Sequence, residues 1–452
     1  MAPSSPADAA HSGGLLGRLG LGRRDVRAWA MYDWANSAFY TTIVAAVFPI
    51  YYRTVAAGGQ SDAEATSRYA WATAIAIFIV AVVAPLLGAV ADFAALKKRM
   101  LAVFLGIGAS STAAMFWITE GDWSLALVLF VLSNVGVAGS IVFYESLLPH
   151  LVREEELDRV SSAGYALGYL GGGTLLAVNL LMIQRPALFG IPDTATATRL
   201  TFVSVAIWWV VFSIPLFRRV PEPAVQLAPG EQLGANALLA GARRLRVTFR
   251  ELRRYRQAFV LLLAFLLYND GIQTMIRMAT IYGTGIGLPQ GAMISALLLT
   301  QFIGVPCAFL FGIAAGRVGA KTAIFAGLSV YLVISVLGYF MSTATHFFIL
   351  AGLVGMVQGG TQALSRSLFA SMVPRHKASE FFAFFGVFER YAGVLGPAIF
   401  ALVVEYTGSG RSAILAVSGF FISGGAVLAL VDVAGGRRDA RAAEAELAAR
   451  AT

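Results

Sequence analysis

Long apolar runs dominate this sequence and set the strongest constraint on its fold. Twelve runs are roughly 20 residues long, the length that a helix needs to cross the ~30 Å hydrocarbon core of a membrane. Hydrophobic residues make up 58% of the chain and charged residues only 13%, whereas a water-soluble domain has about half and about a quarter. We expect spans at 29–52, 69–91, 100–118, 124–145, 162–184, 200–217, 258–282, 292–315, 321–340, 346–372, 381–404 and 411–432. The sequence therefore predicts an all-α membrane protein with twelve transmembrane helices.

Short motifs recur at a nearly constant distance, which indicates a duplication. Gly88–Asp92 closes one apolar run and is followed by Lys97 and Arg99, and about 224 residues later Gly312–Arg317 is followed by Lys321. Two halves of apolar helices joined by a polar link are the arrangement of a transporter whose site lies between the halves. We therefore expect two pseudo-symmetric six-helix bundles. Two further pairs have an offset of about 225: 148–150 with 373–375, and 168–171 with 393–396.

The composition argues against several other classes of function. The net charge is +9, but Lys and Arg cluster between apolar runs, where they orient a membrane protein and form no nucleic-acid-binding face. Cys307, the single cysteine, lies in an apolar run, and the four histidines lie in tails or at helix ends. These patterns predict no disulfide framework, no metal site, no cofactor and no enzyme active site.

The basic residues also predict the orientation of the chain. If the N-terminus is cytoplasmic, that side receives most of the Lys and Arg, including those of 97–99, the central link and the C-terminal tail. The asymmetry predicts a multi-pass protein of the cytoplasmic (inner) membrane with both termini inside the cell. The basic residues left on the opposite side are Arg53, Arg68, Arg185, Arg199 and Arg411.

The same pattern predicts five segments. Residues 1–26 have no apolar core or cleavage site, so we expect a disordered cytoplasmic tail and not a signal peptide. The two six-helix bundles are expected at 27–217 and 257–432, followed by a cytoplasmic tail at 433–452. The link at 218–256 mixes apolar and basic residues, which favours an amphipathic helix on the anionic cytoplasmic leaflet; a solvated charged linker fits equally well.

Polar side chains inside apolar spans are candidates for function, because an unpaired buried polar group costs several kcal/mol. Two spans carry an acid, an amide three residues later and a hydroxyl four residues later, and such positions share one helix face. We expect both faces to look into the space between the halves. The residues are Asp33, Asn36 and Ser37 in the first span and Asp270, Gln273 and Thr274 in the seventh.

Each acid also has a structural alternative. Asp33 lies about one turn inside its span, where a helix cap or a pair with Arg27 would fit as well as a role in binding. Asp270 lies about thirteen residues into its span, near mid-bilayer at about 1.5 Å per residue, which favours a functional role. A close ion pair with Arg277 would instead make Asp270 structural.

Further polar residues mark the tenth and eleventh spans. Gln358, Gln362 and Arg366 recur along one stripe of a helix, which fits either the wall of a cavity or a ladder of helix-packing hydrogen bonds. Glu389 and Arg390 are adjacent and point in different directions, and one of them could meet Asp270 or Arg277. Aromatic residues near these groups, including Tyr268, are interpreted as packing residues or as ligand contacts.

The duplicated glycine-rich and basic motif resembles the loop motif that major facilitator superfamily transporters carry between helices 2 and 3 and between helices 8 and 9. The first copy keeps the acidic residue, Asp92, and the second has Gly316 at that position. The resemblance covers essentially the whole chain and implies a major facilitator fold. It also implies that the motif residues act in gating: Gly88, Asp92, Lys97, Arg99, Gly312, Arg317 and Lys321.

Three other stretches resemble a narrower family, the vacuole-effluxer branch of that superfamily. They are Trp29–Phe39 in the first span, Tyr268–Thr274 in the seventh and Gly359–Ser367 in the tenth. The branch includes the autophagy-related amino-acid exporters of fungal vacuoles. The resemblance therefore implies efflux of amino acids.

We expect a secondary active transporter that moves a small polar or zwitterionic solute, foremost an amino acid or a derivative, by alternating access with proton coupling. A larger amphiphilic or sugar-conjugate cargo, or a non-transporting membrane receptor, are the alternatives. Arg366 would bind a carboxylate, and Asp33 or Asp270 would bind an amine or the proton. The expected partners are a small-molecule substrate, protons and membrane lipid, with no nucleic acid, and the protein is expected to be a monomer. The candidate substrate-binding residues are Asp33, Asn36, Tyr268, Asp270, Gln273, Gln358, Gln362 and Arg366; the candidate proton-coupling residues are Asp270, Asp33 and Glu389.

The predicted orientation can be tested by thiol labelling after Cys307→Ser removes the native thiol. A cysteine placed in the Thr54–Ser67 segment should react with an impermeant maleimide added outside intact cells. A cysteine placed in the Pro221–Pro229 link should react only after the cells are opened. The reverse pattern of labelling would overturn the orientation.

Overall fold

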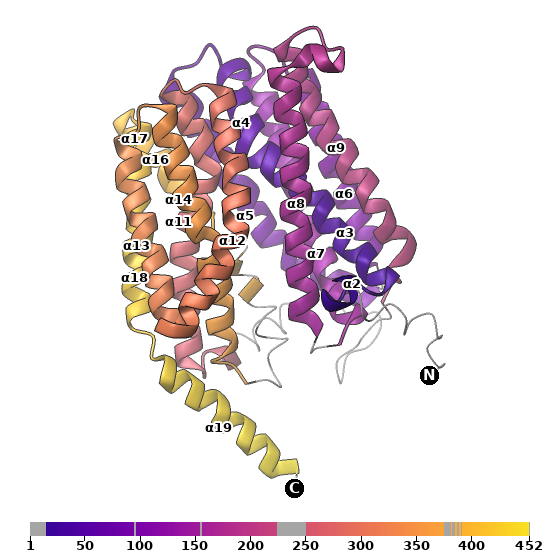
Figure 1. Ribbon diagram of the computed structural model, residues 1–452, viewed down its shortest axis with the longest axis vertical. Helices are drawn as coiled ribbons and strands as arrows, with labels where there is room; N and C mark the ends of the chain where they lie inside the picture. Colours follow the sequence, from indigo (N-terminus) through magenta and orange to yellow (C-terminus); the bar gives the residue numbers. More distant parts are fainter. Residues whose placement is uncertain are drawn as a thin grey trace. The chain divides into compact units, whose positions relative to one another are not determined.

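The computed structural model describes residues 15–94, 96–153, 156–223, 250–374, 381, 385–386, 388–389 and 391–451. All regular secondary structure in these residues is helical (Figure 1). Helix covers most of each of the twelve predicted spans within the described residues, and nine helices there are long and apolar enough to cross a membrane. The all-α expectation is therefore confirmed.

The first span is a nearly continuous helical segment with two π-helical stretches. A short helix, α2 (Leu15–Arg18), precedes it. The segment consists of α3 (Arg24–Phe39), a π-helical stretch (Tyr40–Ala46), α4 (Val47–Tyr51) and a second π-helical stretch (Tyr52–Ala56). The helices that follow are α5 (Asp62–Ala94), α6 (Lys97–Ala114), α7 (Trp123–Leu151), α8 (Leu157–Gln184) and α9 (Thr194–Arg219).

The second half of the chain repeats this order of long helices but interrupts one of them. Its helices are α11 (Arg256–Gly285), α12 (Gln290–Val318), α13 (Ala320–Tyr339), α14 (Ala344–Ala370), α16 (Leu395–Thr407), α17 (Gly410–Ala416), α18 (Ser418–Ala429) and α19 (Val433–Ala451). The predicted span at 381–404 is not one helix. Phe388, Glu389 and Tyr391 are helical, residues 392–394 leave the helix, and α16 then begins at Leu395.

The described residues divide into two compact units. The first unit contains residues up to Gly58 and from Leu86 to 223, and the second contains Gly59–Pro85 and the residues from 250 onward. Most of α5 therefore belongs to the second unit, although it comes from the first half of the sequence. The predicted domain bounds stay predictions, and parts of the predicted tail (1–14) and linker (224–249) lie outside the described residues.

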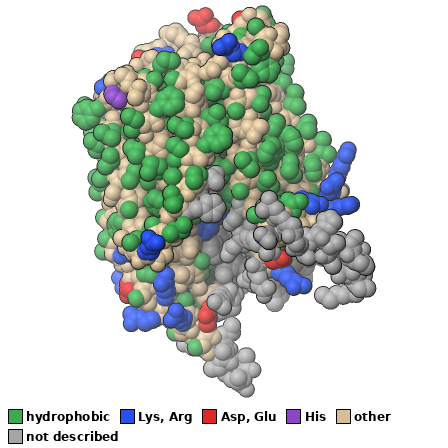
Figure 2. Space-filling model, viewed as in Figure 1, with side chains coloured by type: hydrophobic (Ala, Val, Ile, Leu, Met, Phe, Trp, Pro, Cys, Tyr) green, Lys and Arg blue, Asp and Glu red, His purple; other side chains and the backbone are tan. Residues whose placement is uncertain are grey.

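Several hydroxyl groups in the spans are satisfied within their own helix, as a hydrocarbon environment favours. Apolar side chains cover the flanks of the helices on the face shown in Figure 2. Hydroxyl groups inside the spans bond back to the preceding turn: Thr73 donates to the carbonyl of Tyr69 at 2.9 Å, and Thr112 donates to that of Gly108 at 2.7 Å. Such bonds satisfy a hydroxyl without a partner on another helix.

The ends of α6 and α9 hold each other through a reciprocal pair of charged side chains. The Glu222 carboxylate accepts the backbone N–H groups of Lys97 (2.7 Å) and Lys98 (2.9 Å) at the start of α6. In return, Lys98 Nζ donates to the carbonyls of Phe217 (2.9 Å) and Val220 (2.7 Å) at the end of α9. Each charge has the sign that stabilises the helix end that it meets.

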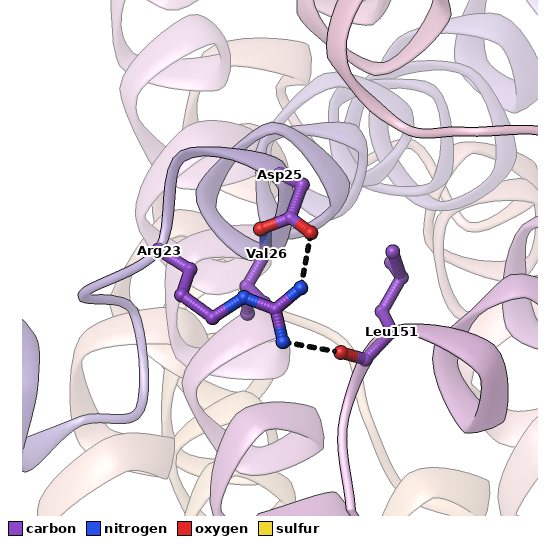
Figure 3. Close-up of polar contacts among 4 residues, drawn as sticks. All are labelled: Arg23, Asp25, Val26 and Leu151. Atoms are coloured by element: carbon purple, nitrogen blue, oxygen red, sulfur yellow. Dashed lines mark hydrogen bonds and ion pairs between the residues drawn. The ribbon is translucent and has the colours of Figure 1, made fainter. Parts of the chain in front are cut away.

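Two other basic residues cap helix ends in the same manner. In the second unit, Lys321 Nζ donates to the carbonyls of Ala429 (2.9 Å) and Val431 (2.8 Å), where α18 ends. In the first unit, Arg23 Nη1 donates to the carbonyl of Leu151 at the end of α7 (2.7 Å), and its other amino group pairs with Asp25 (Figure 3). Basic residues at these helix ends therefore have a structural role.

Glycines let α8 lie directly against α3. A Cβ added at Gly171 would collide with the backbone of Trp34, and one added at Gly172 would lie 3.0 Å from the carbonyl oxygen of Ser37. At Gly173, two positions further along α8, no described heavy atom lies within 4 Å of the same point. Small residues are needed at the first two positions because only they allow this close approach.

This packing predicts opposite outcomes for two neighbouring substitutions. Gly171→Ala should destabilise the protein by about 1–3 kcal/mol, because the helices cannot separate without losing other contacts. Gly173→Ala should be neutral or stabilising by up to ~1 kcal/mol, because alanine is the better helix former. Thermal unfolding in detergent measures the stability of both variants. Equal melting temperatures for the two variants would contradict the close packing of α8 against α3.

Candidate functional site

Asp33 on α3 is the acid that the first unit holds among aromatic side chains. Its Oδ2 accepts a hydrogen bond from the Tyr144 hydroxyl of α7 at 2.7 Å. The absence of a side chain at Gly164 of α8 leaves room for the carboxylate, since a Cβ there would lie 2.5 Å from Oδ2. The Tyr144 ring stacks on Trp29 with 4.5 Å between ring centroids. Within the described residues Asp33 forms no ion pair, so the half-buried carboxylate can still accept a cationic group.

The other two members of this predicted polar face have different surroundings. Asn36 is buried, and its Nδ2 donates to the carbonyl of Tyr32 one turn earlier at 2.9 Å. The Ser37 hydroxyl faces Gly168 on α8, where a Cβ would lie 2.5 Å from it. Of the three, Asp33 is the residue that can carry a charge.

Asp270 on α11 faces the interruption before α16. Its Oδ1 accepts the backbone N–H of Gly396 at 2.7 Å, and its Oδ2 accepts that of Leu395 at 3.1 Å. The side chain is 1% exposed. The carboxylate therefore supplies the hydrogen-bond acceptors that the first turn of α16 lacks.

The neighbours of Asp270 on the same face of α11 also pack against this interruption. Gln273 lies against Gly393, whose φ of +101° requires glycine. Thr274 donates to the carbonyl of Asp270 at 2.7 Å and leaves no room for a Cβ at Gly396. The second acid–amide–hydroxyl pattern thus holds a break in a helix.

The polar stripe of α14 has partners on two helices. Gln362 Nε2 donates to Asn269 Oδ1 of α11 at 3.1 Å, and the hydroxyls of Tyr268 and Ser365 lie 2.5 Å apart. Arg366 forms an ion pair with Glu389 at 3.0 Å, and the two side chains are 38% and 31% exposed. Gln358 is half-buried. Of the stripe, Gln362 therefore makes a helix-packing hydrogen bond and Arg366 an accessible ion pair, and the choice between a cavity wall and a hydrogen-bond ladder stays open.

The residues predicted to act in gating have varied surroundings. Lys97 Nζ donates to the carbonyl of Ser146 (3.4 Å) and lies 3.1 Å from His150 Nε2, and Lys321 caps α18. Arg99, Gly312 and Arg317 are exposed. Gly88 and Asp92 lie in a part of α5 whose side chains are outside the description. A gating role stays a prediction for this set.

Sequence reasoning missed several residues that join these groups. Tyr144 and Asn269 carry no signal in the sequence, because a lone tyrosine or asparagine in an apolar span is usually a packing residue. Glu405 lies one residue beyond the predicted span at 381–404, and its Oε1 accepts hydrogen bonds from Ser67 (2.7 Å) and Trp71 (2.8 Å) of α5. Its carboxyl group in an otherwise apolar helix was the available signal.

The acids and the arginine described above can bind charged groups. In the described part of the chain, His, Cys, Asp and Glu form no group of three or more that would suit a metal. The first unit presents an acid beside aromatic rings, and the second unit presents an arginine in an accessible pair with an acid. Such groups bind an ammonium or a carboxylate through charge-assisted hydrogen bonds.

Comparisons with known proteins agree on the class. The chain is 35% identical to the MFS-type transporter YxiO of Bacillus subtilis (strain 168) over 407 residues, 89% of this chain and 94% of YxiO. It is similar in structure to a D-xylose–proton symporter (TM-score 0.65, 13% identity, 91% of this chain and 98% of that one). It is also similar to a bacterial homologue of the human lysosomal transporter Spinster in an inward-facing, unoccupied conformation (TM-score 0.66, 13% identity, 95% and 98%).

The helical repeat, the fold and these relatives define a multi-pass membrane protein of the major facilitator superfamily. A narrower family model, described as vacuole effluxer Atg22 like, matches residues 22–441. The chain belongs to this family. Autophagy-related protein 22-1 of Penicillium rubens is 22% identical over 88% of the chain and 82% of its own length.

The exposure of the Arg366–Glu389 pair predicts a weak interaction. Solvent screens a pair that is about a third exposed, so a double-mutant cycle with Arg366→Gln and Glu389→Gln should give a coupling energy of about 0.2–1 kcal/mol. Unfolding in detergent of the wild type, both single variants and the double variant measures it. A coupling energy above ~3 kcal/mol, as expected for a buried structural pair, would contradict this interpretation.

Proposed function

We propose that the protein is a secondary active transporter of amino acids or related zwitterionic solutes across the cytoplasmic membrane, coupled to protons. The accessible Arg366–Glu389 pair carries this proposal. A guanidinium group binds a carboxylate through two parallel hydrogen bonds, and a weakly held partner can be displaced by another carboxylate. The family's description as vacuole effluxers supports transport of small solutes but names no substrate.

Exchange at Arg366 supplies a route to proton coupling. When a solute carboxylate takes the guanidinium, Glu389 loses its cationic partner, and we propose it as the proton-coupling residue beside the bound solute. When the solute leaves, Glu389 pairs with Arg366 again. Asp33 and Asp270 remain the other coupling candidates and are tested in parallel.

Asp33 is proposed to bind the amino group of the solute. The Tyr144 hydroxyl donates a hydrogen bond to one oxygen of the Asp33 carboxylate, and the Tyr144 ring is held by stacking on Trp29. An ammonium group bound to this carboxylate would gain an electrostatic attraction and a hydrogen bond. An amine-bearing solute therefore suits Asp33 in the first unit, and a carboxylate-bearing solute suits Arg366 in the second.

Radiolabelled solutes in proteoliposomes test the proposal. The panel contains amino acids, D-xylose and a nucleoside, with and without an imposed pH gradient. We expect accumulation of amino acids that follows the gradient. Accumulation of xylose or the nucleoside alone, or no accumulation of any solute, would overturn the assignment.

Two substitutions then separate binding from coupling. Arg366→Gln should weaken binding of carboxylate-bearing solutes by roughly 10–100-fold, because a charge-assisted hydrogen bond is worth about 1.5–3 kcal/mol. Glu389→Gln cannot titrate, so it should abolish accumulation driven by the pH gradient while counterflow exchange continues. If Glu389→Gln still concentrates solute, coupling belongs to Asp33 or Asp270, and Asp33→Asn and Asp270→Asn decide between them.

A further inference from the structure

The interruption before α16 exists in only one of the two repeats. Residues 168–171 and 393–396 are matching motifs, yet α8 runs through the first without a break, whereas residues 392–394 leave the helix before the second. The last helical bond before the break runs from Ala392 N–H to the carbonyl of Phe388 (3.0 Å). The acids facing the two motifs differ accordingly: Asp33 accepts from the hydroxyl of Tyr144, and Asp270 accepts from two backbone N–H groups.

The opposite end of α16 holds α5. Glu405 Oε1 accepts hydrogen bonds from the Ser67 hydroxyl and the Trp71 indole, both on the portion of α5 that belongs to the second unit. Ser67 is only 4% exposed. Leu395 and Glu405 are ten positions apart on one uninterrupted helix, a rise of about 15 Å. Because α16 is uninterrupted between these two residues, a displacement of its first turn also displaces Glu405.

We propose that Asp270 is a positioning residue for transport: by holding the first turn of α16 at the helix break, it fixes the place where Glu405 meets Ser67 and Trp71 of α5. This inference deepens the proposed transport function, because it separates an acid that positions a helix from acids that bind solute or protons. Both oxygens of Asp270 already accept backbone N–H groups, and Gly396 has no room for any side chain beside them. The α5–α16 contact therefore depends on a residue that touches neither Ser67 nor Trp71.

Thiol reactivity measures this contact without any solute. In a Cys307→Ser background, Ser67→Cys places a thiol where the hydroxyl meets Glu405, and its reaction with a maleimide in detergent should be slow. Glu405→Gln, which weakens the contact directly, should speed the reaction. Asp270→Asn should speed it roughly fivefold, since the amide puts an N–H donor against an N–H donor and removes the charge that stabilises the start of α16.

Combining the variants tests whether they act on one contact. Asp270→Asn with Glu405→Gln should react no faster than the faster single variant, because the same contact is already open. Gly396→Ala, whose Cβ would collide with the Thr274 hydroxyl and crowd Asp270 Oδ1, should reproduce the effect of Asp270→Asn. Multiplicative effects, or a reaction rate that neither Asp270→Asn nor Gly396→Ala changes, would overturn the proposal.

Two controls separate positioning from general loosening. Ser335→Cys on α13 places a thiol at a site with 0% exposure in the same unit, and its reactivity should not change in the Asp270→Asn variant. If both thiols become more reactive, Asp270 supports the unit as a whole and the proposal fails. Glu64→Gln removes a charge that pairs with Arg68 on α5, one turn from Ser67, and should leave the Ser67→Cys rate unchanged. Because no solute is used, the result is independent of whether the protein carries amino acids.

Discussion

Hydrocarbon offers no hydrogen bonds, so every backbone N–H and C=O group of a membrane helix must find its partner within the protein. The ends of helices and any break inside them are where this requirement is hardest to meet. In this protein, charged side chains provide hydrogen-bond partners for the backbone groups at several helix ends. Lys98 and Lys321 donate to the last carbonyls of α9 and α18, Glu222 accepts from the first N–H groups of α6, and Asp270 does the same for α16. The positions of the charges follow from the positions of the helix ends.

The two halves of the sequence repeat share one helix-capping contact but differ at the glycine motif. Lys98 and Lys321 occupy corresponding sites and cap corresponding helices, so this part of the repeat kept its role. The glycine motif did not, since Gly171 lets an unbroken α8 approach Trp34, whereas Gly396 admits a carboxylate at the start of a new helix. An acid with a similar neighbourhood in the sequence therefore binds a hydroxyl in one half and a helix terminus in the other.

The sequence predicted the elements and the family well because those follow from local patterns. Apolar runs of membrane-spanning length placed helix on every span, and the stretches at Trp29–Phe39 and Tyr268–Thr274 indicated the vacuole-effluxer branch, which the comparison confirms. The hydrogen-bond partners of the polar residues could not be predicted from the sequence. Tyr144 is 111 positions from Asp33, and Leu395 is 125 positions from Asp270, and no local spacing encodes such contacts. The break before α16 was missed for a related reason, because Gly393 in an apolar run is also compatible with a continuous helix.

The strength with which each charge is held separates structure from function more clearly than its depth in the membrane does. Asp270 is the deepest acid by sequence, yet both of its oxygens are engaged by backbone groups that have no alternative partner, so a solute would have to break a helix terminus to use it. Arg366 and Glu389 form an ion pair at 3.0 Å in which both side chains are about a third exposed, so solvent screens their attraction. A transporter must bind and release its cargo repeatedly, so the weaker Arg366–Glu389 interaction suits the binding site that we propose, and the stronger Asp270 contacts suit a place where helices are held.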